Sequence, residues 1–229
     1  MIRRTEVFGD ATLHLGDTMA ALDLMPVVAC MVTDPPFGID YQSGYATEAL
    51  WAGGDKIEGD ADVRVRNWAV AWSQYRGIPA LVFGSWRAPR PPHVRARLIW
   101  DKGGALGMGA LDIPWKPGAE EIYVIGHGWA GSRDCGDVLH CPPVQSMAKN
   151  GRLHPNEKPV RLIEMLLRKC PAGPVLDPFM GSGSTGEACL RAGRAFVGIE
   201  IVPEYFDIAC RRMERLCRQG ELAAEGSRL

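Results

Sequence analysis

The chain lacks long apolar runs, internal repeats, low-complexity tracts and any strong excess of charge. No uninterrupted apolar stretch approaches the length of about 20 residues that a membrane span needs, and no apolar core of signal-peptide length follows the first residues. A cytoplasmic protein is therefore expected. The formal net charge is only −1, so composition alone does not indicate a nucleic-acid partner.

Cysteine occurs at seven positions, but not with the spacing of a metal-binding module or a disulfide framework. Most of these cysteines lie in apolar patterns, as reduced buried thiols of intracellular proteins do, and disulfides are not expected. His127, Cys135, His140 and Cys141 have no paired-ligand spacing. They are predicted to be loop residues, and no metal site is expected.

The length of 229 residues and the hydrophobic content of 46% favour one α/β domain with a substantial core. This domain is predicted to span 1–220, with 221–229 as a flexible tail. Strands alternate with helices after position 150, which favours a Rossmann-like, doubly wound, mostly parallel sheet with ligands at the carboxyl ends of its strands. Strands are predicted near 5–8, 12–15, 27–32, 80–84, 96–101, 121–125, 174–176 and 195–199, and helices near 64–76, 160–170, 185–192 and 203–218.

The most informative segment is the corner Asp34-Pro35-Pro36-Phe37, which follows the apolar run 27–32. Proline fixes φ and donates no amide hydrogen, so the turn presents backbone carbonyls and the Asp34 carboxylate as acceptors. Two acceptors suit the hydrogens of a planar exocyclic amine, and Phe37 can stack on the base that carries this amine. The alternative is a strand-ending turn without chemistry.

A second motif, 175–187, has the form of a short buried strand, a glycine-rich turn and the start of a helix. Its glycines allow a ligand to approach closely, and the spacing of Ser184 and Glu187 fits a capping box. The next predicted strand ends at Glu200, whose carboxylate can accept both hydroxyls of a ribose. A glycine turn followed by an acid is also the dinucleotide fingerprint, so an NAD-dependent dehydrogenase is the competing interpretation. Asp177 argues against it, because its charge would repel a pyrophosphate.

The two motifs, with 34 before 177, resemble those of the β-class of amino-group DNA methyltransferases, which use S-adenosylmethionine. The resemblance continues over most of the chain in short motifs that stand in family order: Leu15-Gly16-Asp17, Trp100-Asp101-Lys102, 120–123, 154–159 and 205–209. It implies S-adenosylmethionine as the cofactor and double-stranded DNA as the substrate, within the restriction–modification setting of a bacterial or phage-infected cell. Adenine N6 is the implied acceptor, because an acid at position 34 is typical of adenine-specific members.

The resemblance also implies a role for each site residue. Asp34 and the Pro35 carbonyl would hold the amine, Pro36 would complete the rigid corner, and Phe37 would stack on the flipped base. The residues implied to bind the cofactor are Asp17, Asp34, His154, Lys158, Pro159, Asp177, Pro178, Phe179, Gly181, Ser182, Gly183, Glu200 and Ile201. Asp17 also has an interpretation as a turn carboxylate.

Two irregular segments, 42–66 and 127–150, are predicted to face DNA. Neither contains an inserted recognition domain, which leaves room for a short target, a partner protein or a homodimer. Basic residues within 87–97 and 149–161 are candidates for phosphate contacts. A solvated basic face is expected on the last helix, formed by Arg211, Arg212, Arg215 and Arg218.

Three other functions stay open. An N4-cytosine methyltransferase is one, although serine in place of Asp34 is commoner among those enzymes. A nucleic-acid-binding homologue without turnover is the second. The dehydrogenase is the third, and it leaves the segments 34–37 and 154–159 unexplained.

Overall fold

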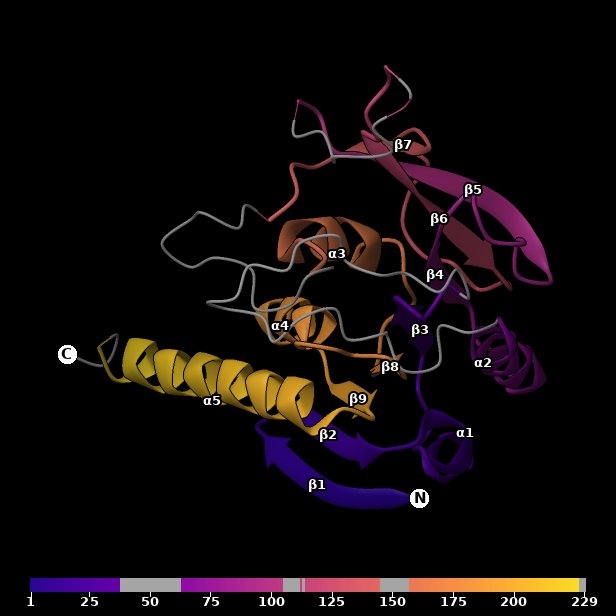
Figure 1. Ribbon diagram of the computed structural model, residues 1–229. Coiled ribbons are helices and arrows are strands. Elements are labelled where there is room, and N and C mark those ends of the chain that lie inside the picture. The colour runs from indigo at the N-terminus through magenta and orange to yellow at the C-terminus, as the bar shows by residue number, and fades with distance from the viewer. Residues whose placement is uncertain (38–62, 105–111, 113, 145–156, 227–229) are drawn as a thin grey trace.

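The computed structural model describes residues 1–37, 63–104, 112, 114–144 and 157–226 (Figure 1). In this part of the chain, nine strands form one sheet in the order β1-β2-β9-β8-β3-β4-β6-β5-β7. The strands are β1 (Ile2–Phe8), β2 (Ala11–Gly16), β3 (Cys30–Thr33), β4 (Ala80–Gly84), β5 (Val94–Asp101), β6 (Ala119–Ile125), β7 (Val138–His140), β8 (Val175–Asp177) and β9 (Phe196–Glu200). The helices are α1 (Thr18–Ala21), the 3-10 turn η1 (Leu22–Leu24), α2 (Arg64–Tyr75), α3 (Val160–Leu167), α4 (Ser184–Arg191) and α5 (Pro203–Gly226).

The centre of the sheet is parallel. Strands β2, β9, β8, β3 and β4 all run in one direction, whereas β1 and β6 are antiparallel to their neighbours. The short β7 pairs in parallel with β5 at the edge of the sheet. The prediction of a mixed, mostly parallel α/β sheet is confirmed.

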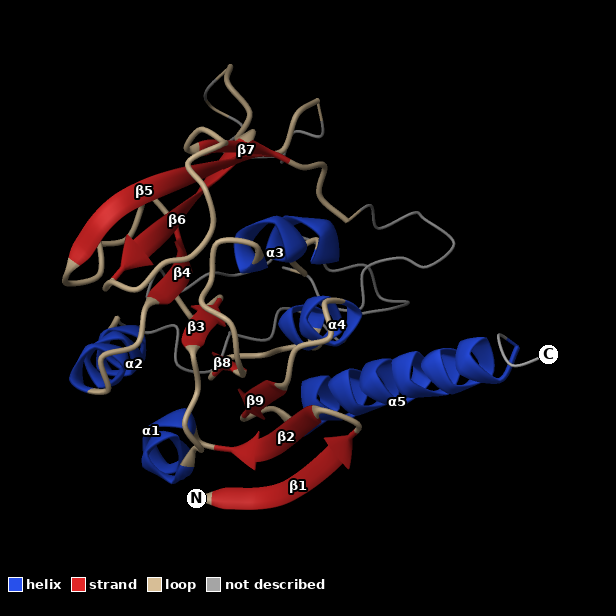
Figure 2. Cartoon of the chain, turned by 180° about the vertical axis from the view of Figure 1, so that it is seen from behind, coloured by secondary structure: helices blue, strands red, loops and turns tan. Residues whose placement is uncertain are grey.

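Helices cover both faces of the sheet, as both ribbon views show (Figures 1 and 2). Helices α3, α4 and α5 pack on one face, where Leu162, Ala188 and Phe206 belong to the larger apolar core. Helices α1 and α2 pack on the other face, where Ala21 and Trp72 join a second core. Parallel strands are buried on both faces in this arrangement, which explains their nearly continuous apolar sequences.

The sheet brings the two sequence motifs together. Strands β3 and β8 are neighbours, with Cys30 paired to Val175 and Met31 paired to Leu176. Because both strands run in the same direction, Asp34 after β3 and Asp177 at the end of β8 lie at the same carboxyl edge. Ligands bind at this edge in open α/β sheets.

Several boundaries differ from the sequence predictions. Helix α5 continues to Gly226 instead of ending before Gly220. A single glycine weakens a helix without necessarily ending it, so Gly220 lies inside α5. Strand β3 begins at Cys30 and not at position 27. Val27 is apolar but 84% exposed, so the apolar run begins before the strand does.

The two predicted DNA-facing segments contain regular structure. Residues 64–66 already belong to α2, and β7 interrupts the stretch 127–144. The remainder of both segments, 42–62 and 145–150, lies outside the described residues. The pattern of β7 is too short for sequence periodicity to detect, because only three residues pair.

Two further observations concern the whole described chain. All seven cysteines are free thiols. Among the helices described, none combines the length and the apolar character that crossing a membrane requires.

Gly183→Ala is expected to lower the free energy of unfolding by about 2 kcal/mol or more. An alanine here meets a left-handed φ of 83° and also the Cβ of Ala209 on α5, only 3.1 Å away. Gly193→Ala is the matched control, because Gly193 also has a left-handed φ, 63°, but open space around an added Cβ. The control should lose only about 1 kcal/mol. Urea-induced unfolding measures both variants, and equal losses would show that α5 does not press on this turn.

Candidate active site

A buried carboxylate joins the ends of the two central strands. Asp177 is 2% exposed, and its Oδ1 accepts hydrogen bonds from Thr33 Oγ1 at 2.7 Å and from the Phe179 amide at 3.1 Å. Burial raises the pKa of Asp177 to about 6, and these donors oppose the rise. Asp177 therefore fixes β3 to β8 and to the loop that follows β8.

The glycine-rich loop after β8 is held by the acid at the end of the next strand. Glu200 accepts the Gly181 amide at 2.9 Å through Oε2 and the Val202 amide at 2.8 Å through Oε1. Burial raises the pKa of Glu200 to about 7, against the effect of the backbone amides. Gly181 has a φ of 51° and open space where a Cβ would stand, so its backbone is accessible to a ligand.

The predicted capping box is not formed. Gly183 occupies the N-cap position of α4 and provides no side-chain cap, while Glu187 forms ion pairs with Arg191 and Arg212. The competing charge of two guanidinium groups accounts for this difference, because an ion pair in a buried site is stronger than a capping bond. Ser184, the first residue of α4, accepts a hydrogen bond from Arg212 instead.

A buried lysine contacts the predicted catalytic carboxylate. Lys158 Nζ lies 2.7 Å from Asp34 Oδ2 and 3.2 Å from Glu120 Oε2. Glu120 Oε1 also lies 2.5 Å from Lys102 Nζ. Two carboxylates and two ammonium groups therefore form a cluster with no net charge, in which Lys158 is the central cation.

The electrostatics of this cluster differ between its two carboxylates. Burial raises the pKa of Asp34, and Glu120 adds to the rise, while Lys158 opposes it. Burial acts on Glu120 in the same direction, but Lys158 and Lys102 together hold its pKa below the ordinary value. Among the described residues, Asp34 Oδ1 is buried without a hydrogen-bond partner. An unsatisfied buried acceptor of this kind suits a ligand that brings a donor.

Aromatic rings surround the same ammonium group. Lys158 Nζ lies 5.9 Å from the centre of the Phe37 ring and 5.2 Å from that of Phe83. Phe37 is partly buried against the larger core, directly after the two prolines. The corner 34–37 thus presents a carboxylate and an aromatic ring side by side, as its sequence predicts.

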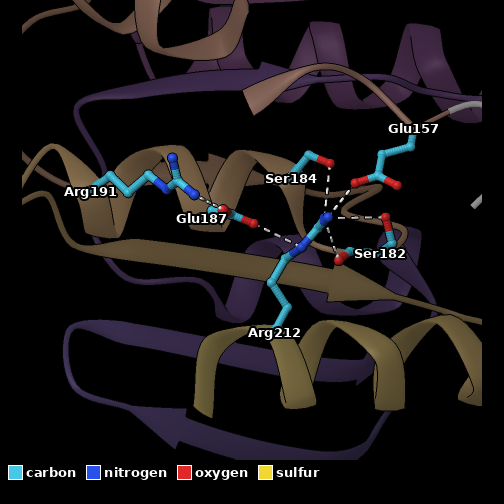
Figure 3. Close-up of polar contacts among 6 residues, drawn as sticks. All are labelled: Glu157, Ser182, Ser184, Glu187, Arg191 and Arg212. Atoms are coloured by element: carbon cyan, nitrogen blue, oxygen red, sulfur yellow. Dashed lines mark hydrogen bonds and ion pairs between the residues drawn. The ribbon is translucent and has the colours of Figure 1, made fainter. Parts of the chain in front are cut away.

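A second buried cation lies behind the glycine-rich loop (Figure 3). Arg212 of α5 donates to the Ser182 carbonyl and to Ser184 Oγ, both at 3.0 Å. Its guanidinium also binds Glu157, and its Nε lies 2.9 Å from Glu187 Oε2. The prediction of a solvated basic face is wrong for Arg212, which is 6% exposed, although Arg211, Arg215 and Arg218 are exposed.

The other predicted site residues lie in several places along this edge. Asp17 accepts the Met19 amide at 2.7 Å and caps α1, as the turn interpretation predicts. Thr18 donates to the Pro178 carbonyl, which brings α1 to the loop after β8. Pro159 is the N-cap of α3, and Ile201 follows Glu200 with its carbonyl bound by Arg3. His154 lies outside the described residues.

The basic stretch after β4 is partly used within the fold. Arg95 donates to the Gly126 carbonyl at 3.0 Å, and Arg97 lies 2.9 Å from Glu121. Arg87 is exposed beside Trp86, whose ring centre is 5.5 Å from its guanidinium carbon. Of the second stretch, Lys158 is buried and Arg161 is exposed.

Sequence reasoning placed Lys158 at the cofactor and did not assign a role to Glu120 at all. The structure brings both to Asp34, because β6 and the residues before α3 meet at the end of β3. The pair Glu120 and Glu121 in an otherwise apolar strand was the available signal, since a carboxylate in a buried strand needs a partner.

The arrangement combines a nucleotide-type loop with a polar corner. Gly181 and Glu200 offer an open backbone and an acid at one side, and Asp34 with Phe37 offers an acceptor and a flat ring at the other. Such a site can hold a nucleoside next to a second planar ligand that carries an amine.

Comparison with known protein families gives one family model, described as DNA methylase, which matches residues 114–211. The type II methyltransferase M.ScaI of Streptomyces caespitosus is 42% identical over 84 residues, which cover 34% of this chain and 28% of that protein. The DNA adenine methyltransferase YhdJ of Escherichia coli (strain K12) is 38% identical over 81 residues, 34% of this chain and 28% of its own. These two matches thus span less than a third of either relative.

A longer match extends over most of the chain. The type II methyltransferase M.Cfr9I of Citrobacter freundii is 27% identical over an alignment of 263 positions, which covers 89% of this chain and 88% of that protein.

Solved structures share the fold. The structure of M1.HpyAVI in complex with SAM has a TM-score of 0.63 at 19% identity and covers 89% of this chain and 98% of its own. The PvuII DNA methyltransferase, named as cytosine-N4-specific, has a TM-score of 0.62 at 14% identity and covers 96% of each chain.

The pH dependence of stability is expected to reflect Glu200. Its folded pKa of about 7 lies above the ordinary value of 4.5, so the folded protein binds this proton more tightly than the unfolded chain does. The free energy of unfolding should therefore fall as the pH rises from about 4.5 to about 7, by roughly 3 kcal/mol at most for this group. Glu200→Gln should flatten the slope, and urea unfolding between pH 5 and pH 8 measures it.

Asp134→Asn is the control for this experiment. The ion pair with Lys169 lowers the pKa of the exposed Asp134 to about 2, so this group stays ionised throughout the range. Its variant should keep the wild-type slope. A wild-type slope in Glu200→Gln would contradict the assignment to Glu200.

Proposed function

We propose that this chain, which matches the DNA methylase family model over residues 114–211, transfers the methyl group of S-adenosylmethionine to N6 of adenine in double-stranded DNA. The observation that carries the proposal is that Asp34 and the glycine-rich loop follow neighbouring parallel strands and so lie at the same carboxyl edge of the sheet. The family match supports methyl transfer to DNA, and the acid at position 34 supports adenine.

Asp34 and the Pro35 carbonyl are the proposed acceptors for the target amine. Within the described chain Asp34 Oδ1 has no partner, so it can accept one amine hydrogen without losing an existing bond. The lone pair of an exocyclic amine is delocalised into its ring, and acceptors that bind its hydrogens draw the nitrogen toward tetrahedral geometry. Phe37 would stack on the flipped base and hold its plane.

Lys158 is proposed to keep Asp34 ionised, against the effects of burial and of Glu120. Burial alone would favour the protonated form of Asp34, which cannot accept through both oxygens. The ammonium at 2.7 Å stabilises the carboxylate, and Glu120 balances the charge of Lys158. This arrangement reassigns Lys158 from the cofactor to the amine end of the site.

The cofactor would bind along the loop after β8. When bound, S-adenosylmethionine supplies an electrophilic methyl group on a sulfonium. Glu200 can accept ribose hydroxyls, because its two carboxylate oxygens offer about four lone-pair sites and three backbone amides act on them. Gly181 leaves room for the nucleoside, and Asp177, Pro178, Phe179, Ser182 and Gly183 hold the loop that surrounds it. We further propose Asp17, Pro159, Ile201 and His154 as the remaining contacts.

Transfer forms the bond between the amine nitrogen and the methyl carbon and breaks the bond from that carbon to sulfur. The amine then loses one proton, and Asp34 is the nearest proposed acceptor that can bind it before release to water. No covalent intermediate with the protein is needed, so the rate depends on in-line positioning and on exclusion of water.

N4 of cytosine is the second candidate acceptor. The similarity in fold to a methyltransferase named as cytosine-N4-specific supports it, because both amines present the same hydrogens to an acid-Pro-Pro corner. We propose one catalytic domain over 1–220, acting in the cytoplasm, and a homodimer as one route to recognising a longer target. The non-catalytic homologue is the alternative if no base is modified.

Asp34→Ala is expected to reduce methyl transfer at least about a hundredfold, because it removes a preorganised acceptor from the amine. Affinity for S-adenosylmethionine should stay within a few-fold, since Asp34 faces the base. Lys158→Met should likewise lower turnover more than cofactor affinity. Tritiated methyl transfer to unmethylated bacterial DNA and calorimetry measure the two effects.

Asp207→Ala, which changes an exposed carboxylate on α5, is the control and should behave like the wild type. Equal loss of cofactor binding in Asp34→Ala would move Asp34 to the cofactor, and unchanged turnover would end the proposed mechanism.

The modified base is expected to be N6-methyladenine. Expression in a methylation-deficient host, followed by nucleoside mass spectrometry and modification-aware sequencing, identifies the base and its sequence context together. N4-methylcytosine alone would replace adenine by cytosine while keeping the mechanism. No modified base in DNA, in the presence of measured cofactor binding, would favour the non-catalytic homologue.

A further inference from the structure

Arg212 is the most extensively bonded buried cation that the structure describes outside the amine corner. Its side chain is 6% exposed, and those of its partners Glu157 and Glu187 are 4% and 6% exposed. Figure 3 shows its guanidinium among groups from three different segments. The family resemblance gave no role to this residue, and the proposed transfer does not use it.

One set of these contacts fixes the cofactor loop. Arg212 Nη1 binds the Ser182 carbonyl and Ser184 Oγ at 3.0 Å each. Gly181 and Gly183, which flank Ser182, both have left-handed φ values, so this loop depends on outside contacts to adopt one conformation. Glu200 holds the loop at the Gly181 amide, and Arg212 holds it at the following residues.

The other contact reaches toward the amine corner. Arg212 Nη2 binds Glu157, and the next residue, Lys158, binds Asp34 at 2.7 Å. A continuous chain of contacts thus leads from Ser182 and Ser184 through Arg212 to the segment that places Lys158. The guanidinium fork suits this task, because its donors point in fixed directions that an ammonium group cannot reproduce.

Stability alone does not account for such a cluster. Burying a guanidinium with two carboxylates costs desolvation energy that their attraction only roughly balances, and apolar replacements of buried ion networks are often equally stable. What an ion network adds is directional contact between segments that apolar packing would allow to shift.

We infer that Arg212 is a positioning residue that aligns the S-adenosylmethionine loop with Lys158 and Asp34, so that cofactor affinity and methyl transfer both depend on it. The inference rests on the proposed function, because it assigns the loop to the cofactor and Asp34 to the amine. It predicts a defect in binding and turnover that is separate from any defect in stability.

The test compares three changes in the full chain. Arg212→Met removes the cation that two buried carboxylates share, although Glu187 keeps its ion pair with Arg191, and should lower the unfolding midpoint. The triple variant Arg212→Met, Glu157→Gln and Glu187→Gln removes the whole charge cluster and should restore much of that loss. Arg212→Lys keeps the charge without the fork. Arg218→Met, which removes an exposed ion pair from the same helix, is the matched control.

Three measurements separate the outcomes: urea unfolding, calorimetry with S-adenosylmethionine, and turnover on unmethylated bacterial DNA at saturating cofactor. The triple variant and Arg212→Lys should both bind the cofactor at least tenfold more weakly and turn over at least tenfold more slowly, and Arg218→Met should match the wild type. Wild-type affinity and turnover in either folded variant would overturn the inference.

The wild-type protein in the same experiment distinguishes the two proposals. A wild type that does not bind S-adenosylmethionine would contradict the proposed function and the inference together. A wild type that binds and methylates, with an unaffected triple variant or Arg212→Lys, would contradict only the positioning role. If the triple variant does not fold, Arg212→Lys alone decides.

Discussion

The two buried cations at the carboxyl edge of the sheet, Lys158 and Arg212, have to be neutralised by carboxylates of other segments, and the site is built around this constraint. Glu157 and Lys158 are consecutive residues, yet each belongs to a different neutral cluster. Glu157 joins Arg212 behind the glycine-rich loop, and Lys158 joins Asp34 and Glu120 at the corner 34–37. Each carboxylate therefore requires a cation from another element, which ties α5, β6 and the start of α3 to the strand ends.

The parallel pairing of β3 and β8 determines where these clusters can form. It places Asp34 and Asp177 at one edge of the sheet. Thr33, the residue before Asp34, donates a hydrogen bond across the two strands to Asp177. Helices α3, α4 and α5 then cover one face, where the segment before α3 supplies Lys158 and α5 supplies Arg212. The two proposed reactants would thus meet between neighbouring strands, where few backbone movements can separate them.

The same edge carries carboxylates whose ionisation opposes folding. Burial raises the pKa of both Asp177 and Glu200, so ionising either one at neutral pH costs free energy that the rest of the fold must offset. Neither lies within an ion pair that the structure describes; their contacts are hydroxyl and amide donors. For Glu200 this agrees with the proposed role, because a permanent ion pair would occupy the oxygens that the proposed ribose contact needs.

The sequence by itself determined the class of the sheet, the order of its main elements and the two motifs at its carboxyl edge. Those features follow from local patterns: apolar strands, glycine at left-handed turns, and prolines that fix a corner. Only the tertiary structure decided which charges are buried. Arg212 and the exposed Arg215 belong to the same run of arginines, and nothing in the sequence distinguishes the buried one from the exposed one. Likewise, the motif around Lys158 does not show that Asp34 is its partner. Burial and ion pairing depend on contacts between residues far apart in sequence, and β7 pairs only because β5 already lies beside it.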